Sequence, residues 1–382
     1  MELYVHIPFC KQKCRYCSFT SFPSQESYIQ EYIKLLLLEA QFRQDEADET
    51  IKTVYIGGGT PSLLPPELLT ELISGLRRIF DLSSVEEFTA EANPGTLTGK
   101  WLDTAVMLGI NRLSLGMQTY PEKHLRLLGR IHTFDDVQAS VSLARNAGFS
   151  NISLDLIFGI PTQTIHEWEL TTEAALSLEP AHISAYGLIP EPGTPLDDDL
   201  QCGRYALPDP EDERIMYDLF ISKSADSGFH QYEISNFARD LFECRHNIGY
   251  WTQVPYLGLG VSAASMGGIV YNEYGMNYIR SSNPDSVGTY EKGVRSGHMP
   301  ARERISPSEA RFETMMLGLR MNRGVDEKEF LKRHRLSVDE CYGDRLRKME
   351  KQGLVIHANG TWKLTARGFD IQNSVLVELM DD

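Results

Sequence analysis

Short runs rich in β-branched and aromatic residues alternate with longer amphipathic segments along the first half of the chain. The short runs end at Gly, Pro or polar residues and predict buried strands at 3–7, 53–56, 87–91, 111–115, 151–157 and 182–186. The longer segments predict helices at 28–43, 66–79, 100–108, 134–147 and 164–178. Such alternation is typical of βα units around a parallel sheet, so we expect an α/β fold built as an incomplete (β/α)6 barrel, with its site at the C-terminal ends of the strands.

The pattern changes after the sixth predicted strand. Residues 190–210 are rich in Pro and Asp, a helix is predicted near 211–227, and Gly-rich loops follow as far as Gly268. Beyond residue 303 the chain predicts helices followed by a hairpin that turns at Asn359 and Gly360. We therefore expect a partial barrel at 1–190, an extension at 191–302 that covers its open side, and a winged-helix-like domain at 303–382.

A winged helix raises the question of nucleic-acid binding, with 338–351 as its recognition helix. Acidic residues outnumber basic ones by 53 to 37, which gives a formal charge of −16. Residues 303–382 hold 14 basic and 14 acidic residues, so the whole excess lies in residues 1–302. The last domain is neutral rather than basic, and we expect a lid or docking module in preference to a DNA-binding domain.

The apolar runs also bear on location. The longest one lies around 35–38, far short of the roughly 20 residues that span a bilayer. The first residues lack the basic segment of a secretory signal peptide. These features predict a chain without a transmembrane segment, located in the cytoplasm, whose six cysteines stay reduced. Cys202, Cys244 and Cys341 are isolated and are expected to be small buried side chains.

The other three cysteines, Cys10, Cys14 and Cys17, crowd into a loop directly after the first predicted strand. Their short spacing aims three thiolates at one point, which is typical of metal ligands. A structural zinc site usually has four protein ligands, and His6 is the one imidazole nearby. A [4Fe-4S] cluster held by three cysteines leaves one iron open for an exchangeable ligand, so the cluster is the favoured interpretation.

This cysteine motif, with Tyr16 before its last cysteine, resembles the signature of radical S-adenosylmethionine (SAM) proteins. Residues 57–61, Gly-Gly-Gly-Thr-Pro, follow the second strand, and further polar residues follow the later strands. Together they are similar to the SAM pocket of coproporphyrinogen-oxidase-like radical SAM proteins. The resemblance implies that Cys10, Cys14 and Cys17 hold a [4Fe-4S] cluster whose open iron binds SAM. It further implies that SAM is flanked by Tyr4 and Tyr16, met at its amino-acid end by Gly58, Gly59 and Thr60, and hydrogen-bonded by Glu91, Gln118, Arg130 and Asp155.

Two features indicate the branch of this family. Oxidases of this type carry a fourth cysteine where this chain has Phe19, and a long extension before the cluster where this chain has nine residues. Residues 244–251 resemble the HNxxYW segment of HemW-type haem chaperones, which makes His246 the candidate axial ligand of haem iron. Relatives commonly have a further His at the position of Ala264, and if that His ligates haem in them, this chain must bind haem differently, more weakly or not at all.

The leading hypothesis is a haem chaperone that holds a [4Fe-4S] cluster and SAM, binds haem as cargo, and passes it to an acceptor protein. The first alternative is an oxygen-independent coproporphyrinogen III oxidase, which uses a SAM-derived radical for oxidative decarboxylation. The second alternative is a winged-helix regulator that senses redox state through the cluster. The expected partners are haem and a haem-accepting protein, without nucleic acid.

Overall fold

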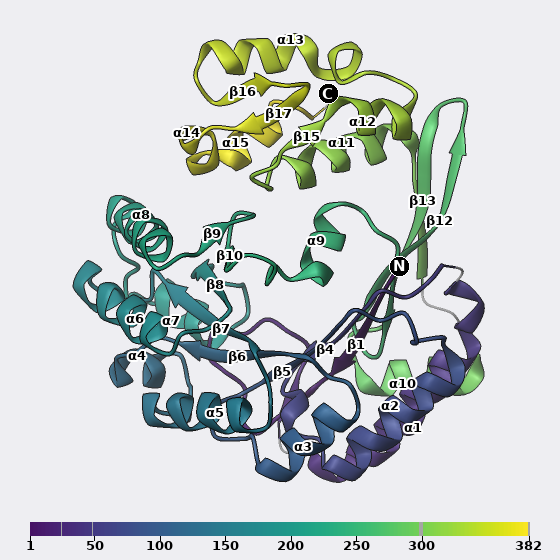
Figure 1. The fold of residues 1–382 in the computed structure, drawn as a ribbon, viewed down its shortest axis with the longest axis vertical. Helices are drawn as coiled ribbons and strands as arrows, with labels where there is room; N and C mark the ends of the chain where they lie inside the picture. The colour runs from purple at the N-terminus through teal and green to yellow at the C-terminus, as the bar shows by residue number, and fades with distance from the viewer. Residues whose placement is uncertain (24, 48, 298–300, 381–382) are drawn as a thin grey trace.

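The centre of the molecule is a curved sheet of six neighbouring parallel strands (Figure 1). The computed structural model describes residues 1–23, 25–47, 49–297 and 301–380. In the order in which they pair, the central strands are β1 (Glu2–Ile7), β4 (Thr53–Gly58), β5 (Glu87–Ala92), β6 (Arg112–Gln118), β7 (Asn151–Phe158) and β8 (His182–Gly187). All six predicted strands are thus confirmed, and the α/β partial barrel is the observed fold.

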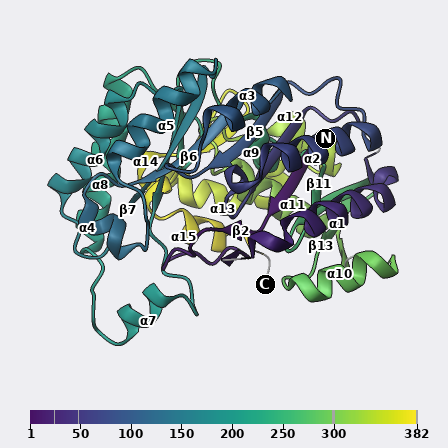
Figure 2. The same cartoon turned by 90° about the horizontal axis from the view of Figure 1, so that it is seen from below.

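Helices cover the outer face of this sheet, as Figures 1 and 2 show. The five predicted helices are confirmed as α1 (Ile29–Phe42), α2 (Pro66–Ile79), α3 (Gly99–Met107), α5 (Phe134–Asn146) and α6 (Ile165–Ser177). Thr133 caps α5 and Thr164 caps α6, each through a capping box that satisfies the first free N–H groups. Two short helices that the periodicity did not reveal are α4 (Glu122–Leu127) and α7 (Pro195–Gln201).

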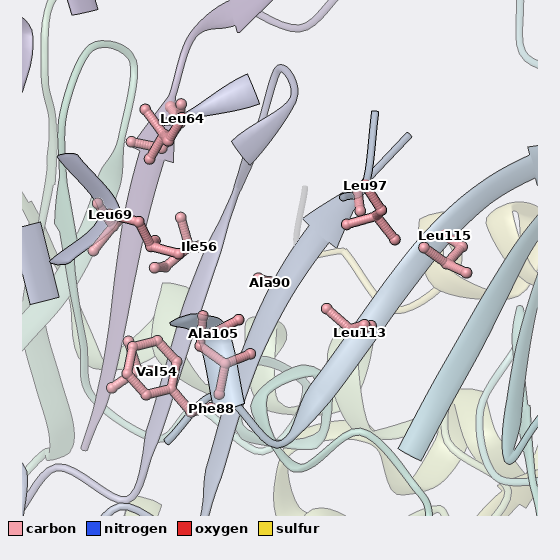
Figure 3. Packing of buried hydrophobic residues seen from close by; sticks show 14 of the residues in the cluster. Val54, Ile56, Leu64, Leu69, Phe88, Ala90, Leu97, Ala105, Leu113 and Leu115 are labelled. Carbon is pink, nitrogen blue, oxygen red and sulfur yellow. The ribbon is translucent and has the colours of Figure 1, made fainter. Parts of the chain in front are cut away.

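Alternate side chains along each strand point to opposite faces of the sheet, one toward the hydrophobic core and one toward the inside of the barrel. Val54 and Ile56 on β4 and Phe88 and Ala90 on β5 point outward and pack beneath α2 and α3 (Figure 3). The residues between them point to the opposite face because successive side chains of a strand alternate. The outer face therefore builds the hydrophobic core, while the inner face is free to carry polar side chains.

The extension lengthens the sheet at both edges, which differs from the expected cover over the open side. At one edge β11 (Tyr256–Leu259) pairs parallel to β1, followed by antiparallel β12 (Ala264–Asn272), β13 (Gly275–Ser282) and β14 (Ala301–Ile305). At the other edge β10 (Asn236–Ala238) pairs antiparallel to β8, and β9 (His230–Gln231) follows. Pairing satisfies the edge N–H and C=O groups of β1 and β8. The result is one twelve-stranded sheet.

The rest of the extension consists of three helices and a short parallel pair. Helix α8 (Pro210–Asp226) confirms the predicted helix, α9 (Arg245–Trp251) contacts β4, and α10 (Val287–Ser296) packs against α1. Strands β2 (Phe9–Cys10) and β3 (Phe22–Pro23) pair across the cysteine loop. Within the described residues, no helix is long and apolar enough to cross a bilayer.

The C-terminal residues form a separate winged-helix-like layer above the barrel (Figure 1). It comprises α11 (Pro307–Gly318), β15 (Val325–Asp326), α12 (Glu327–His334), α13 (Val338–Lys351), β16 (Val355–Ala358), β17 (Thr361–Leu364), α14 (Ala366–Asp370) and α15 (Gln372–Val377). Its own core includes Phe330, Leu346 and Trp362. The hairpin turns at Asn359 and Gly360, which both have positive φ, as predicted.

Helix α13 shows no unbalanced positive face. Arg347 pairs with Asp339 and Asp344, and Lys348 pairs with Glu378. Cations that are already paired with carboxylates offer little to a phosphate backbone. The structure therefore gives no support to a DNA-recognition role for this helix, and the domain boundaries at 190 and 302 stay predictions.

The isolated cysteines differ from one another. Cys244 is buried, as expected, and Cys341 is half-buried, whereas Cys202 is exposed. The prediction was wrong for Cys202 because this residue ends the short helix α7, at its C-terminal cap.

Candidate functional site

A cavity of about 500 Å³ lies inside the barrel and reaches the C-terminal ends of its strands. Its wall is made of inward-facing residues of β4 to β8, together with the cysteine loop that follows β1. Every residue predicted for the cluster and for SAM lines this cavity except Tyr4 and Thr60. The predicted lining residues are Cys10, Cys14, Tyr16, Cys17, Gly58, Gly59, Glu91, Gln118, Arg130 and Asp155.

The three clustered cysteines are free thiols at the mouth of the cavity. Among the described residues, no three His, Cys, Asp or Glu side chains are arranged to hold a single metal ion. The three thiols nevertheless line one cavity, so they suit a group larger than one ion, such as an iron-sulfur cluster. Burial raises the pKa of Cys10 and raises that of Cys17 to about 11, so loading a metal group would release protons.

Polar side chains surround the thiols. Arg130 donates from Nη1 to Cys14 Sγ at 3.4 Å and from Nη2 to the carbonyl oxygen of Gly116 at 2.8 Å. Thr60 donates to Cys10 Sγ at 3.7 Å and accepts a hydrogen bond from Asn93 Nδ2 at 2.7 Å. The guanidinium places a fixed positive charge beside the cysteine loop, which favours thiolate ligands and a ligand carboxylate.

Two glycines, Gly58 at the end of β4 and Gly59 directly after it, let the backbone approach the cysteine loop closely. A Cβ on Gly59 would lie 2.7 Å from the carbonyl oxygen of Phe9, and Gly58 has a φ of +109°, where a Cβ would meet the His6 ring at 2.4 Å. No larger residue fits either position without a shift of its neighbours. The Gly-Gly pair therefore keeps this part of the cavity open for a ligand.

Glu91 is held rigidly at the end of β5. Its Oε1 accepts a hydrogen bond from the Tyr55 hydroxyl at 2.8 Å, and its Oε2 accepts one from the Gly58 N–H at 2.9 Å. Burial raises the pKa of Glu91 to about 7. A preorganised carboxylate of this kind suits a pair of ligand hydroxyl groups.

Asp155 occupies a similar place on β7, where both of its oxygens accept from Ser114 Oγ at 3.0 Å. Burial also raises the pKa of Asp155. Gln118 ends β6 with a φ of 64°, a left-handed conformation that turns its side chain toward the cavity wall. Tyr4 does not line the cavity, and its hydroxyl lies 2.9 Å from His6 Nδ1.

His246 does not lie at this cavity. It is 1% exposed on α9, at the opposite, N-terminal end of the strands. Its Nδ1 is 2.7 Å from Thr53 Oγ1, and its Nε2 is 2.9 Å from the Tyr250 hydroxyl, so both ring nitrogens have partners. Burial lowers the pKa of His246 to about 3. The predicted role of His246 as a haem ligand is therefore untested, and in the described conformation its two ring nitrogens are occupied.

Helix α9 as a whole closes the N-terminal end of the barrel. Glu87, the first residue of β5, accepts hydrogen bonds from the backbone N–H groups of Arg245 and His246 at the start of the helix. A Cβ on Gly249 would lie 1.7 Å from the Glu2 carboxylate, so the helix can pack on β1 only with Gly at this position. Ala264 begins β12 and pairs with Ser282 in the sheet.

The prediction that arises at this end concerns Glu2. Its carboxyl group is 3% exposed, and burial raises its pKa from 4.5 to about 9. Between these values the folded chain binds more protons than the unfolded chain. Glu2 therefore lowers the free energy of unfolding by up to about 1.4 kcal/mol per pH unit as the pH rises. We expect Glu2→Gln to remove this slope between about pH 5 and 9 in urea unfolding. Equal slopes in the variant and the wild type would contradict the assignment.

Several lining residues were missed by sequence reasoning, and they share a position on the inner face of a strand or helix: Tyr55, Arg112, Ser114, Ser184, Tyr186 and Asn247. The lining residues on strands could have been predicted, because side chains on a strand alternate and those next to core residues face the cavity. Asn247 could not be found this way, because the short helix that carries it has no periodic pattern.

Comparisons with known proteins agree with this geometry. Residues 4–175 match the Radical SAM superfamily, and residues 305–371 match the HemN C-terminal domain. The chain is 37% identical to heme chaperone HemW of Bacillus subtilis (strain 168) over 97% of both chains. It is 34% identical to heme chaperone HemW of Lactococcus lactis, covering 99% of this chain and 97% of the relative.

Among solved structures, coproporphyrinogen III oxidase (HemN) from Escherichia coli matches with a TM-score of 0.85 at 23% identity. The match covers 99% of this chain and 89% of that chain, and at this identity it shows a shared fold. The near full-length identity to the chaperones is the more specific finding. The chain belongs to the HemW family of radical SAM proteins.

Proposed function

We propose that this chain is a haem chaperone, which binds haem and transfers it to a haem-accepting protein. The observation that carries the proposal is the identity of 37% to a heme chaperone HemW along 97% of both chains. The polar cavity with three thiols at its mouth supports the cofactor part of the proposal. A cytoplasmic location belongs to the same proposal, because a reducing compartment keeps such thiols available.

The cavity residues fit a [4Fe-4S] cluster and SAM. Cys10, Cys14 and Cys17 would hold the cluster, which when bound supplies an open iron for an exchangeable ligand and a centre for one-electron chemistry. The chain itself contributes Arg130 as a fixed cation beside Cys14 and Glu91 as a rigid hydrogen-bond acceptor. These groups orient a bound ligand before any chemistry takes place.

Haem binding is tested by titrating the anaerobically reconstituted protein with haemin and following the Soret band. We expect saturation at one haem per chain, followed by loss of the bound haem to apomyoglobin as a haem trap. The absence of a saturable Soret shift would refute the chaperone proposal, whatever the state of the cluster.

The same titration decides the role of His246. We expect His246→Ala to leave the haem affinity within about twofold of wild type, because an imidazole with both nitrogens hydrogen-bonded in the protein interior is not available to iron. The variant should instead unfold at a lower temperature, since it leaves a cavity beside Tyr55.

Tyr250→Phe is the control, because it removes one hydrogen bond of His246 and keeps the imidazole. If His246→Ala loses haem affinity while it stays folded and Tyr250→Phe does not, His246 is a haem ligand after all.

A further inference from the structure

Arg112 is a buried cation without a direct partner among the described residues. It begins β6 on the inner face of the barrel, lines the cavity and is 2% exposed. Among the residues that the structure describes, its guanidinium makes no hydrogen bond and no ion pair, and its Nε is fully enclosed. A buried charge without direct partners is costly, so the position calls for an explanation.

Arg43 is a second buried arginine, and its hydrogen bonds are those expected of an arginine with a structural role. Arg43 is 1% exposed, and its guanidinium donates to the carboxylates of Glu39 and Glu46, to the Gly258 carbonyl oxygen and to Ser265 Oγ. All three of its nitrogens are thereby satisfied. Arg112 is as deeply buried and has none of these contacts.

The carboxylates around Arg112 are already bound to other donors. Glu91 accepts from Tyr55 and Gly58, Asp155 accepts from Ser114, and Glu87 accepts from the start of α9. Burial alone would lower the pKa of Arg112, but the surrounding acidic groups outweigh burial and raise it. The guanidinium is thus a permanent cation whose donors face the cavity unused.

Asn247 brings a second unused donor to the same place. It lies on α9 and lines the cavity, and its side-chain amide makes no hydrogen bond with any part of the described chain. Arg112 begins β6 and pairs with Thr89, two residues before Glu91 on β5, so it lies about 7 Å below Glu91 along the barrel, toward the N-terminal ends of the strands. Helix α9 is bound to Glu87, the first residue of β5, so Asn247 and Arg112 both line the cavity toward the N-terminal ends of the strands, away from the cysteines.

We propose that Arg112 and Asn247 form a carboxylate-binding subsite in this part of the cavity. A guanidinium binds a planar carboxylate through two parallel hydrogen bonds, and an amide adds a third donor. The acidic neighbours Glu91 and Asp155 repel a polyanion such as phosphate, which favours a monoanionic carboxylate. The ligand is therefore an organic carboxylate, or the carboxylate arm of a larger molecule, that shares the cavity with SAM.

The test is calorimetric titration of the SAM-loaded, cluster-containing protein with propionate as the probe, and with phosphate in parallel. We expect saturable propionate binding in the wild type and no saturable phosphate binding. Arg112→Gln should weaken propionate at least tenfold, and Arg112→Lys should restore part of the affinity. The affinity for SAM should stay within about twofold in both variants.

Three results would overturn the subsite. They are the absence of propionate binding to wild type, equal propionate affinity in Arg112→Gln, and a tenfold loss of SAM affinity in Arg112→Gln, which would assign Arg112 to the SAM carboxylate. If Arg112→Gln does not fold, Asn247→Ala carries the same comparison with a smaller expected loss. The assay contains no haem, so its outcome is independent of the chaperone proposal.

Discussion

Replacing Cys10, Cys14 and Cys17 together with Ala is expected to abolish iron binding after anaerobic reconstitution. The three thiols line one cavity mouth, and in the described part of the chain no other group of residues offers comparable ligands. Wild type should hold about four irons per chain and show the charge-transfer absorption of a [4Fe-4S] cluster. The measurement is iron content together with the visible absorption spectrum.

Cys202→Ala is the matched control, because Cys202 is an exposed thiol outside the cavity. We expect this variant to keep the full iron content. Full iron content in the triple variant would show that the cluster is held elsewhere, and loss of iron in Cys202→Ala would show that Cys202 contributes to iron binding.

The second large effect is expected at Glu91. Removing its carboxylate with Glu91→Ala should weaken SAM binding by about ten- to a hundredfold, which is the usual cost of hydrogen bonds to a charged group. Tyr55 and Gly58 hold this carboxylate in one orientation. In Glu91→Ala no neighbouring group can supply the same hydrogen bonds to SAM. Equilibrium dialysis of SAM against the reconstituted protein measures the loss. Unchanged affinity would remove Glu91 from the SAM site.

The pH dependence of SAM affinity gives a second, independent test of the role of Glu91. Because burial raises the pKa of Glu91 to about 7, the carboxylate becomes protonated as the pH falls through neutrality. SAM affinity of the wild type should therefore decrease between about pH 8 and 6. In Glu91→Gln the affinity should stay flat over this range, because the amide does not titrate. Tyr55→Phe keeps the carboxylate but removes a hydrogen bond that lowers its pKa, so the pH dependence should persist and move to higher pH.

The strands and the residues at their ends could be predicted because both depend on patterns among residues that are close together in the sequence. Val54 and Ile56 alternate with inward residues, and the Gly-Gly-Thr positions and Glu91 lie at the C-terminal ends of β4 and β5. A parallel sheet brings such strand ends together whatever the rest of the fold does. For this reason the cysteine loop, Gly58, Gly59, Glu91, Gln118, Arg130 and Asp155 all meet at one cavity.

The opposite end of the barrel could not be predicted, because it depends on contacts between distant segments. Strand β11 pairs with β1 across more than half of the chain, and α9 is too short for a periodic pattern. His246 belongs to a motif that can be recognised in the sequence, yet its burial follows from Thr53 and Tyr55 on β4. The sequence does not set Arg112 apart from other strand residues, and only the structure shows that no residue in its described part bonds to the guanidinium.

The most direct test of the account compares two activities in one preparation of the reconstituted protein. Coproporphyrinogen III is supplied with SAM and a reductant, and haem transfer to apomyoglobin is measured in parallel. The account predicts stoichiometric haem binding and transfer, and no formation of protoporphyrinogen IX. Turnover of coproporphyrinogen III to protoporphyrinogen IX without haem binding would contradict it and identify an oxidase.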